Sequence, residues 1–415
     1  MNELSFMDKL LDGVEVEWRP LGEVVLRTSN IKWRNATRSY QYIDLTSVSI
    51  ETKKIIETSV VAPNNAPSRA QKLVEKDDVI FATTRPTQMR YCLIDEKYDG
   101  EIASTGYCVL RVEKEKVLPK WILHLISSSE FKGYLEENQS GSAYPAISDA
   151  KVKEFEIPIP CPDNPEKSLE IQSEIVRILD TFTELTTELT TELSLRKKQY
   201  NHYRDQLLSF EEGEVEWKML GDLGQVRMCK RILKSQTLPG GDIPFYKIGT
   251  FGKTPNAYIS RALFEEYKSK YSYPKVGEVL ISASGTIGRT VTFDGKDSYF
   301  QDSNIVWIEN DEEIVLNKFL FYFYQVANWG VSEGGTIQRL YNDNLRKLSI
   351  PVPYPNDPEK SLAEQARIVD ILDKFDTLTT SISEGLPREI ELRQKQYEYY
   401  RNLLLSFPKS GKEAA

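Results

Sequence analysis

The chain has 415 residues, of which 40% are hydrophobic and 28% are charged, and its formal net charge is −9. This is the composition of an ordinary globular protein, and no apolar run approaches the ~18 residues of a bilayer span, which argues against a membrane protein. At about 100 to 200 residues per domain the length predicts more than one domain, and a start without a basic, apolar leader predicts a cytoplasmic protein.

The first strand-rich segment of the chain occupies residues 25–140. A β-branched and aromatic run at residues 77–82 predicts a strand, a polar loop follows at residues 83–90, and a second polar loop closes the segment at residues 139–145. Arginine, glutamine, serine and threonine in such loops can contact base edges and phosphates, although polar loops also connect strands in proteins of other functions. The candidate DNA-contacting residues of this segment are Arg85, Thr87, Gln88, Arg90, Ser142 and Tyr144.

A long helix is predicted to begin near Pro165. Its apolar residues, separated by 4, 3, 4, 3 and 4 positions as in a heptad seam, are Ile171, Ile175, Ile178, Phe182, Leu185 and Leu189. Within this helix a Thr-Glu-Leu-Thr/Ser unit is written three times over residues 183–194. One unit more or less would change the helix length by about 6 Å while nearly preserving its face. The alternative is that these residue types are simply common on exposed helices.

The second half of the chain repeats the frame of the first half. Ile157-Pro158-Ile159-Pro160 returns as Ile350-Pro351-Val352-Pro353, a displacement of 350 − 157 = 193 residues. The tryptophan-containing opening at residues 15–18 returns at residues 214–217, a displacement of 214 − 15 = 199 residues. Such a period is far longer than that of a solenoid, so each copy has the size of a domain.

The second strand-rich segment, residues 225–333, has the same order of features but almost none of the same residues. A strand predicted at residues 277–282 precedes a polar loop at residues 284–289, and another polar loop follows at residues 334–339. The first of these loops lacks the Lys-Ser/Thr ending of a nucleotide-binding P-loop. The candidate DNA-contacting residues here are Ser284, Thr286, Arg289, Gln338 and Arg339.

A second long helix follows, with an apolar stripe at Ile368, Ile371, Phe375, Leu378 and Ile382. Two helices of roughly forty residues with one apolar stripe each are predicted to pack on each other in antiparallel fashion, the alternative being that each lies alone on its own domain. Pro387 predicts a kink or a restart in the second helix, because proline removes a backbone donor and clashes with the preceding turn. Residues 7–11 look like the end of a preceding helix, which predicts a cyclically permuted repeat.

Catalytic and metal-binding chemistry find no support in the sequence. Four cysteines lie apart without paired spacing, and only two histidines could join them as zinc ligands. The chain contains no Gly-x-Ser-x-Gly, His-Glu-x-x-His or Asn-Pro-Pro-aromatic motif. We therefore expect a non-catalytic protein without a metal site and without a cofactor of its own.

The assembled pattern resembles the specificity subunit of type I restriction-modification systems over essentially the whole chain. The resemblance rests on the openings at Trp18 and Trp217, the two Ile-Pro tracts, and the Pro-Glu-Lys-Ser-Leu segments at residues 165–169 and 358–362. It implies an α+β fold in which two α/β target-recognition domains with strand-rich cores are joined by two long helices packed as an antiparallel coiled coil, with a pseudo-twofold internal repeat. The implied boundaries are residues 1–160 for the first recognition domain, 161–212 for the central helix, 213–353 for the second recognition domain and 354–415 for the C-terminal helix and tail.

The resemblance also implies a function. Each domain would read one half of a bipartite site in double-stranded DNA, and the helices would set the unread spacer and dock two methyltransferase subunits, with two restriction subunits as optional partners. Those subunits alone would bind S-adenosylmethionine, and ATP with magnesium. The net charge of −9 is weak evidence against DNA binding, because it averages over all surfaces. The competing hypothesis is a non-catalytic scaffold whose duplicated domains bind proteins, whereas an enzyme with an unfamiliar site has little residue support.

Overall fold

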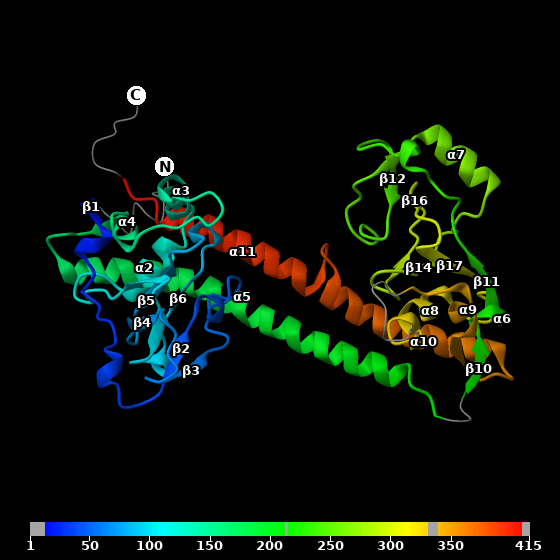
Figure 1. The fold of residues 1–415 in the computed structure, drawn as a ribbon, viewed down its shortest axis with the longest axis horizontal. Coiled ribbons are helices and arrows are strands. Elements are labelled where there is room, and N and C mark those ends of the chain that lie inside the picture. The colour runs from blue at the N-terminus through cyan, green and yellow to red at the C-terminus, as the bar shows by residue number, and fades with distance from the viewer. Residues whose placement is uncertain (1–12, 212–214, 331–338, 409–415) are drawn as a thin grey trace, which may run out of the picture. The chain divides into compact units, whose positions relative to one another are not determined.

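The computed structural model describes residues 13–211, 215–330 and 339–408 (Figure 1). The chain divides into two compact units, residues 1–191 with 389–415, and residues 192–388. Each unit combines one strand-rich domain with parts of both long helical segments. The predicted α+β fold, with two related domains and long helices, is therefore confirmed. The residues 7–11 that suggested a permuted repeat lie outside the described residues.

A two-stranded antiparallel sheet forms the same frame in both units. In the first unit β1 (Val16–Pro20) pairs with β9 (Glu156–Pro160), and Trp18 lies opposite Pro158. In the second unit β10 (Val215–Met219) pairs with β18 (Ser349–Pro353), and Trp217 lies opposite Pro351. Prolines are tolerated here because both strands of a two-stranded sheet are edge strands, which need not donate every backbone N–H. The two repeated motifs are therefore neighbours in space, which explains why they recur together.

Two further sheets are described in the first domain, with the strand orders β3–β2–β7–β4 and β6–β5–β8. Their strands are β2 (Tyr40–Ile43), β3 (Ser59–Val61), β4 (Ala70–Leu73), β5 (Val79–Ala82), β6 (Tyr91–Leu93), β7 (Ile102–Ser104) and β8 (Tyr107–Leu110). The short helices are α2 (Pro119–Ile126), α3 (Ser129–Asn138) and α4 (Asp149–Lys153). The strand predicted at residues 77–82 is β5, which is buried along its whole length.

The second domain has the strand orders β11–β17–β14–β15 and β13–β12–β16. Its strands are β11 (Gly224–Arg227), β12 (Ile243–Tyr246), β13 (Tyr258–Ile259), β14 (Val279–Ser282), β15 (Thr290–Thr292), β16 (Tyr299–Phe300) and β17 (Ile305–Asn310). Its helices are α6 (Leu220–Leu223), α7 (Arg261–Lys270), α8 (Asn317–Tyr324) and α9 (Asn342–Lys347). The predicted strand at residues 277–282 is β14. A parallel pair, β2 with β7 or β12 with β16, recurs in each domain.

The first long helix is continuous and the second is divided. Helix α5 (Pro165–Leu207) spans 43 residues, whereas its counterpart consists of α10 (Pro358–Thr380) and α11 (Gly385–Leu404). A Cβ at Gly385 would lie 2.4 Å from the Thr377 carbonyl oxygen, and φ there is +79°, so the restart requires glycine. The restart predicted near Pro387 is confirmed. Ile382, expected on the apolar stripe, lies in the break and is 84% exposed, so that expectation is wrong.

Within each unit, one part of α5 packs against α10 or α11. In the first unit the rings of Phe182 and Tyr400 stack with 5.2 Å between centroids. In the second unit the rings of Tyr203 and Phe375 stack at 5.6 Å. The later residue of α5 thus contacts the earlier residue of the C-terminal segment, as antiparallel packing requires. The predicted antiparallel packing is confirmed.

A buried glutamine joins each helical segment to the domain of the same unit. The side-chain oxygen of Gln172 in α5 accepts a hydrogen bond from the Leu118 N–H at 2.9 Å, and its amide nitrogen donates to the Lys116 carbonyl at 3.0 Å. Gln365 in α10 makes the same two bonds, at 2.9 and 3.0 Å, to the backbone before α8. Both glutamines are fully buried. The two copies therefore share one way of attaching helix to domain.

We expect Gln365→Leu to lower the free energy of unfolding of the second unit by about 1 to 3 kcal/mol, because the substitution leaves two partly buried backbone groups without partners. These groups are the Leu316 N–H and the Ile314 carbonyl. Chemical denaturation of the full chain, followed by tryptophan fluorescence, measures the change. Gln206→Leu, at an exposed position of α5 in the same unit, is the matched control and should shift the value by less than about 0.5 kcal/mol. Equal effects of the two substitutions would contradict the prediction.

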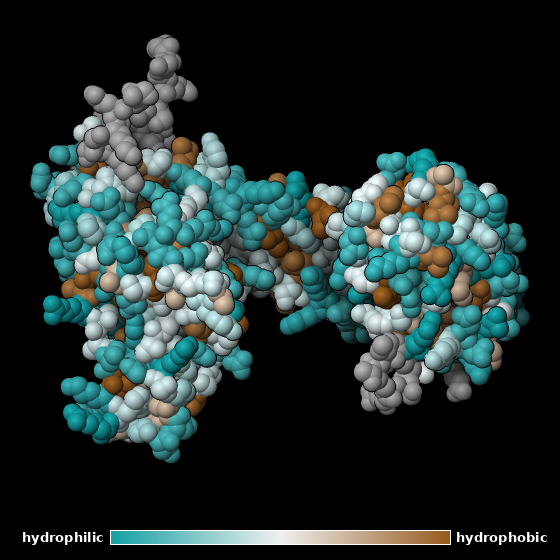
Figure 2. Space-filling model, turned by 45° about the horizontal axis from the view of Figure 1, so that its top comes forward, coloured by the Kyte–Doolittle hydropathy of each residue, from teal (hydrophilic) through white to brown (hydrophobic). Residues whose placement is uncertain are grey.

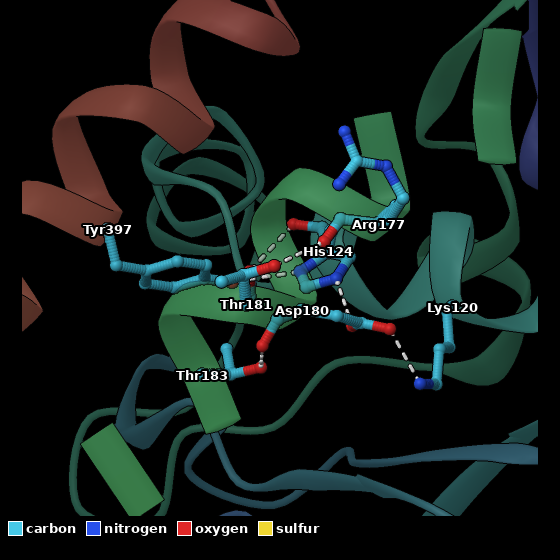
Figure 3. Close-up of polar contacts among 8 residues, drawn as sticks. Lys120, His124, Arg177, Asp180, Thr181, Thr183 and Tyr397 are labelled. Carbon is cyan, nitrogen blue, oxygen red and sulfur yellow. Dashed lines mark hydrogen bonds and ion pairs between the residues drawn. The ribbon is translucent and has the colours of Figure 1, made fainter. Parts of the chain in front are cut away.

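A polar network joins α2, α5 and α11 in the first unit. His124 of α2 contacts the Asp180 carboxylate through Nε2 and the Tyr397 hydroxyl through Nδ1, both at 3.0 Å (Figure 3). Lys120 forms an ion pair with Asp180 at 2.6 Å. Burial acts to raise the pKa of Asp180, but hydrogen bonds from His124 and Lys120 outweigh it, and the pKa is lowered. Asp180 is therefore ionised at neutral pH, and His124, which contacts both Asp180 and Tyr397, links all three helices.

The second unit contains a related network around Asp373 of α10. The Tyr322 hydroxyl donates a hydrogen bond to the Asp373 carboxylate, and Lys318 pairs with it at 3.1 Å. Tyr322 occupies the place in α8 that His124 occupies in α2. In both units this side chain joins the short helix to an aspartate of the long helical segment.

Among the described residues, no helix combines the length and the hydrophobicity needed to cross a membrane. On the face drawn in Figure 2, hydrophilic residues cover most of the surface, and hydrophobic residues form small separate groups. Scattered exposed apolar residues are normal on globular proteins and need no special explanation.

Candidate nucleic-acid interface

The two polar loops predicted in the first domain lie side by side. Thr84, two residues after the end of β5, forms a β-bridge with Ala146. The Arg85 N–H donates to the Pro145 carbonyl at 2.7 Å, and the Ile147 N–H donates to the Thr83 carbonyl at 2.9 Å. The loop after β5 and the loop before α4 therefore form one surface, although α2 and α3 separate them in sequence.

Arg85 is presented from this surface by a left-handed backbone conformation, with φ +50°, just before the short 3-10 helix Pro86–Gln88. Its guanidinium lies over the ring of Tyr144, 5.4 Å from the centroid, and that tyrosine is 72% exposed. Left-handed conformations of non-glycine residues cost energy and cluster at functional sites. The loop pair thus holds an exposed cation against an exposed aromatic ring, an arrangement suited to contact with phosphates or bases.

The other candidates of the first domain differ in their exposure. Gln88 and Ser142 are exposed, and Thr87 is half-buried. The half-buried Arg90 donates a hydrogen bond to the Val48 carbonyl within the domain. Its guanidinium is therefore partly committed to the protein backbone, whereas the Arg85 side chain is exposed.

The second domain brings its two loops together in the same way. Ser284, two residues after the end of β14, forms a β-bridge with Arg339. The Leu340 N–H donates to the Ala283 carbonyl at 2.8 Å. The bridge and this hydrogen bond correspond to the bridge and the Ile147 hydrogen bond of the first domain. In both domains they join the loop after the strand, β14 or β5, to the loop before the helix, α9 or α4. The polar surface is therefore built twice, once in each copy of the repeat.

Two candidates of the second domain are engaged with neighbouring protein groups. Ser284 is buried, and its hydroxyl donates to the Asn304 side-chain oxygen at 2.8 Å. Arg289 is half-buried and donates to the Phe251 carbonyl at 3.0 Å. Both side chains hold the loop after β14 against the rest of the domain.

The two remaining described candidates of this domain, Thr286 and Arg339, are exposed, and Gln338 lies outside the described residues. Arg339 also lines a groove of about 500 Å³ beside the loop pair. The other basic residues of this groove are Arg231, Lys234 and Lys247. Sequence reasoning missed them because they come from separate segments without any motif; only an unusual density of Lys and Arg at residues 227–234 could have drawn attention to the first two.

Three of the described cysteines, Cys92, Cys108 and Cys229, are buried. Burial raises the pKa of the Cys92, Cys108 and Cys229 thiols to about 12, so these thiols are neutral at pH 7 and unreactive. Within the described ranges, no group of three or more histidine, cysteine, aspartate or glutamate side chains is arranged to hold a metal ion.

The duplicated domain carries the same polar loop pair in each copy, so each copy offers one candidate contact surface. A family model described as the type I restriction modification DNA specificity domain matches residues 14–196 and 212–392. A putative type I restriction enzyme specificity subunit of Haemophilus influenzae is 47% identical, over 98% of this chain and 99% of that protein. The EcoR124I/EcoR124II specificity subunit of Escherichia coli is 38% identical, over 99% of this chain and 98% of that protein. The chain belongs to the family of type I restriction-modification specificity subunits, which are non-catalytic DNA-recognition subunits.

Solved structures of type I systems share the fold. A chain from a study of complex assembly and conformational transition of the type I R-M system superposes with a TM-score of 0.61 at 22% identity, covering 94% of this chain and 97% of that chain. The type I S subunit from M. genitalium gives a TM-score of 0.54 at 14% identity, covering 96% and 98%. At these identities the likeness shows a common architecture.

Proposed function

We propose that each domain reads one half of a bipartite site in double-stranded DNA. The observation that carries the proposal is the duplicated loop pair, in which the loop after a buried central strand joins the loop before a short helix. Each pair exposes an arginine, Arg85 in one domain and Arg339 in the other. Two copies of one frame with different loop residues suit two half-sites of different sequence, because base edges are distinguished by the side chains that reach them.

The proposed DNA contacts are the more accessible members of the predicted set. They are Arg85, Thr87, Gln88, Ser142 and Tyr144 in the first domain and Thr286 and Arg339 in the second. Arg90, Ser284 and Arg289 would act mainly by shaping the loops, since they are half-buried or buried and their side chains bond to groups of the same domain. The first group would read the DNA sequence, and the second group would hold the residues of the first group in position.

We also propose that the helical segments dock two methyltransferase subunits, and that two restriction subunits join in some complexes. Those partners would bind S-adenosylmethionine, and ATP with magnesium, and would carry out all covalent chemistry. Support comes from the relatives, which are named as subunits of restriction enzymes. Since the proposed substrate is the cell's own DNA, the proposed place of action is the cytoplasm.

The test is co-expression with a type I methyltransferase subunit, followed by single-molecule sequencing of the host DNA for N6-methyladenine. A single bipartite motif with a fixed gap is the expected result, and it would identify both half-sites at once. Unmethylated DNA in cells that contain a stable complex of the two subunits would instead favour the scaffold hypothesis, in which the duplicated domains bind proteins.

A further inference from the structure

Among the residues that the structure describes, four cations and one carboxylate line the groove beside the loop pair of the second domain. Arg231, Lys234, Lys247 and Arg339 are all exposed, and none of them forms an ion pair with any residue in the described ranges. Unpaired cations along a groove attract phosphates. The carboxylate belongs to Asp302, and it is the feature that a purely phosphate-binding groove would not contain, because it repels phosphate oxygens.

Asp302 is half-buried, yet its carboxylate makes no hydrogen bond or ion pair within the part of the chain that the structure describes. The polar side chains on either side of it do have partners. Gln301 accepts a hydrogen bond from the Ile248 N–H at 3.0 Å, and Asn304 accepts one from the Ser284 hydroxyl at 2.8 Å. The Asp302 oxygens are not fully buried, so the carboxylate remains accessible in the groove as an acceptor that a bound donor can satisfy.

An ionised carboxylate only accepts hydrogen bonds. In the major groove of DNA the exocyclic amino groups of cytosine and adenine are the donors, whereas guanine and thymine present acceptors at the corresponding positions. We infer that Asp302 is a specificity-determining residue that selects cytosine or adenine at one position of the half-site read by the second domain, while the four cations hold the flanking phosphates. This inference rests on the proposed function.

The first domain provides an internal comparison. The Ala283 N–H donates to the Asn304 carbonyl at 2.8 Å, and the Thr83 N–H donates in the same way to the Gly106 carbonyl at 2.8 Å. The segment of the first domain that corresponds to residues 301–304 therefore ends at Gly106, and its residues 103–106 contain no acidic side chain. The selection attributed to Asp302 should consequently affect the second half-site alone.

The experiment uses Asp302→Asn and Asp302→Ala in the complex with the methyltransferase subunit. Methylation motifs are read by single-molecule sequencing, and binding is measured on duplexes that differ at single positions. We expect discrimination at one cytosine or adenine of the second half-site to fall roughly ten- to hundredfold, with the first half-site unchanged. Asp294→Asn is the matched control, since Asp294 pairs with Lys296 at 3.0 Å and does not line the groove.

Two results would overturn the inference. One is an unchanged motif in both Asp302 variants; the other is an equal gain in affinity for every duplex, which would mean that the carboxylate only repels phosphate. Thermal melting establishes that the near-isosteric Asp302→Asn variant is folded, so the test stands even where the alanine variant unfolds. If the unsubstituted complex produces no bipartite motif at all, the proposed function itself fails, and that outcome is distinct from an unchanged motif in the variants.

Discussion

Replacing Arg85 by alanine is expected to reduce discrimination at one base pair of the first half-site by about 1 to 3 kcal/mol, while leaving the second half-site intact. The physical reason is that a guanidinium can donate two hydrogen bonds to guanine, and that Arg85 is exposed and held over the Tyr144 ring, 5.4 Å from its centroid. Binding of the methyltransferase complex to duplexes with single substitutions in each half-site measures the effect.

Three outcomes separate the roles of Arg85. A relaxed position in the first half-site assigns it to base reading, whereas an equal loss on specific and random duplexes assigns it to a phosphate and would refute base reading. Arg38→Ala, at an exposed position of the first domain outside the loop pair, where the arginine pairs with Glu101 at 2.7 Å, is the matched control and should change neither affinity nor motif. Tyr144→Phe retains the ring beneath Arg85 and should behave like the parent chain, whereas Tyr144→Ala should show part of the Arg85→Ala effect.

Deleting residues 187–190 is expected to shorten the recognised spacer by about one base pair. The deletion removes one of three Thr-Glu-Leu-Thr/Ser units from the continuous helix α5 and shortens that helix by about 6 Å. This rise corresponds to at most about two base pairs at ~3.4 Å each, and helix tilt reduces its projection along the DNA. Sequencing of N6-methyladenine should then show both half-sites unchanged and the gap between them reduced.

A control that keeps the helix length is available. The Thr187 and Thr190 hydroxyls donate to carbonyls one turn earlier in α5, at 2.8 and 2.7 Å, so they are satisfied within the helix. The double substitution Thr187→Ala with Thr190→Ala should therefore leave the spacer unchanged. An unchanged spacer in the deletion itself would show that α5 does not set the distance between the half-sites.

Local sequence patterns were sufficient for the elements whose structure depends on near neighbours. Helix α5 follows from its apolar spacing, and β5 and β14 follow from short β-branched runs. The restart of the second helix was predicted from Pro387, but its position was not. The break comprises residues 381–384, in which Ile382 is exposed, and ends at the positive φ of Gly385. A backbone conformation of this kind has no signal in hydrophobic spacing.

The sequence by itself determined the duplicated frame, the two inserts, the long helices and the position of a polar loop after each central strand, because all of these are periodic or repeated along the chain. Only the tertiary structure decided which loop side chains are accessible. Arg90 bonds to Val48, and Ser284 bonds to Asn304, through contacts between residues far apart in sequence. The tertiary structure also decided that four cations from three segments of the chain line one groove with Asp302, since these segments meet only when the chain folds back on itself.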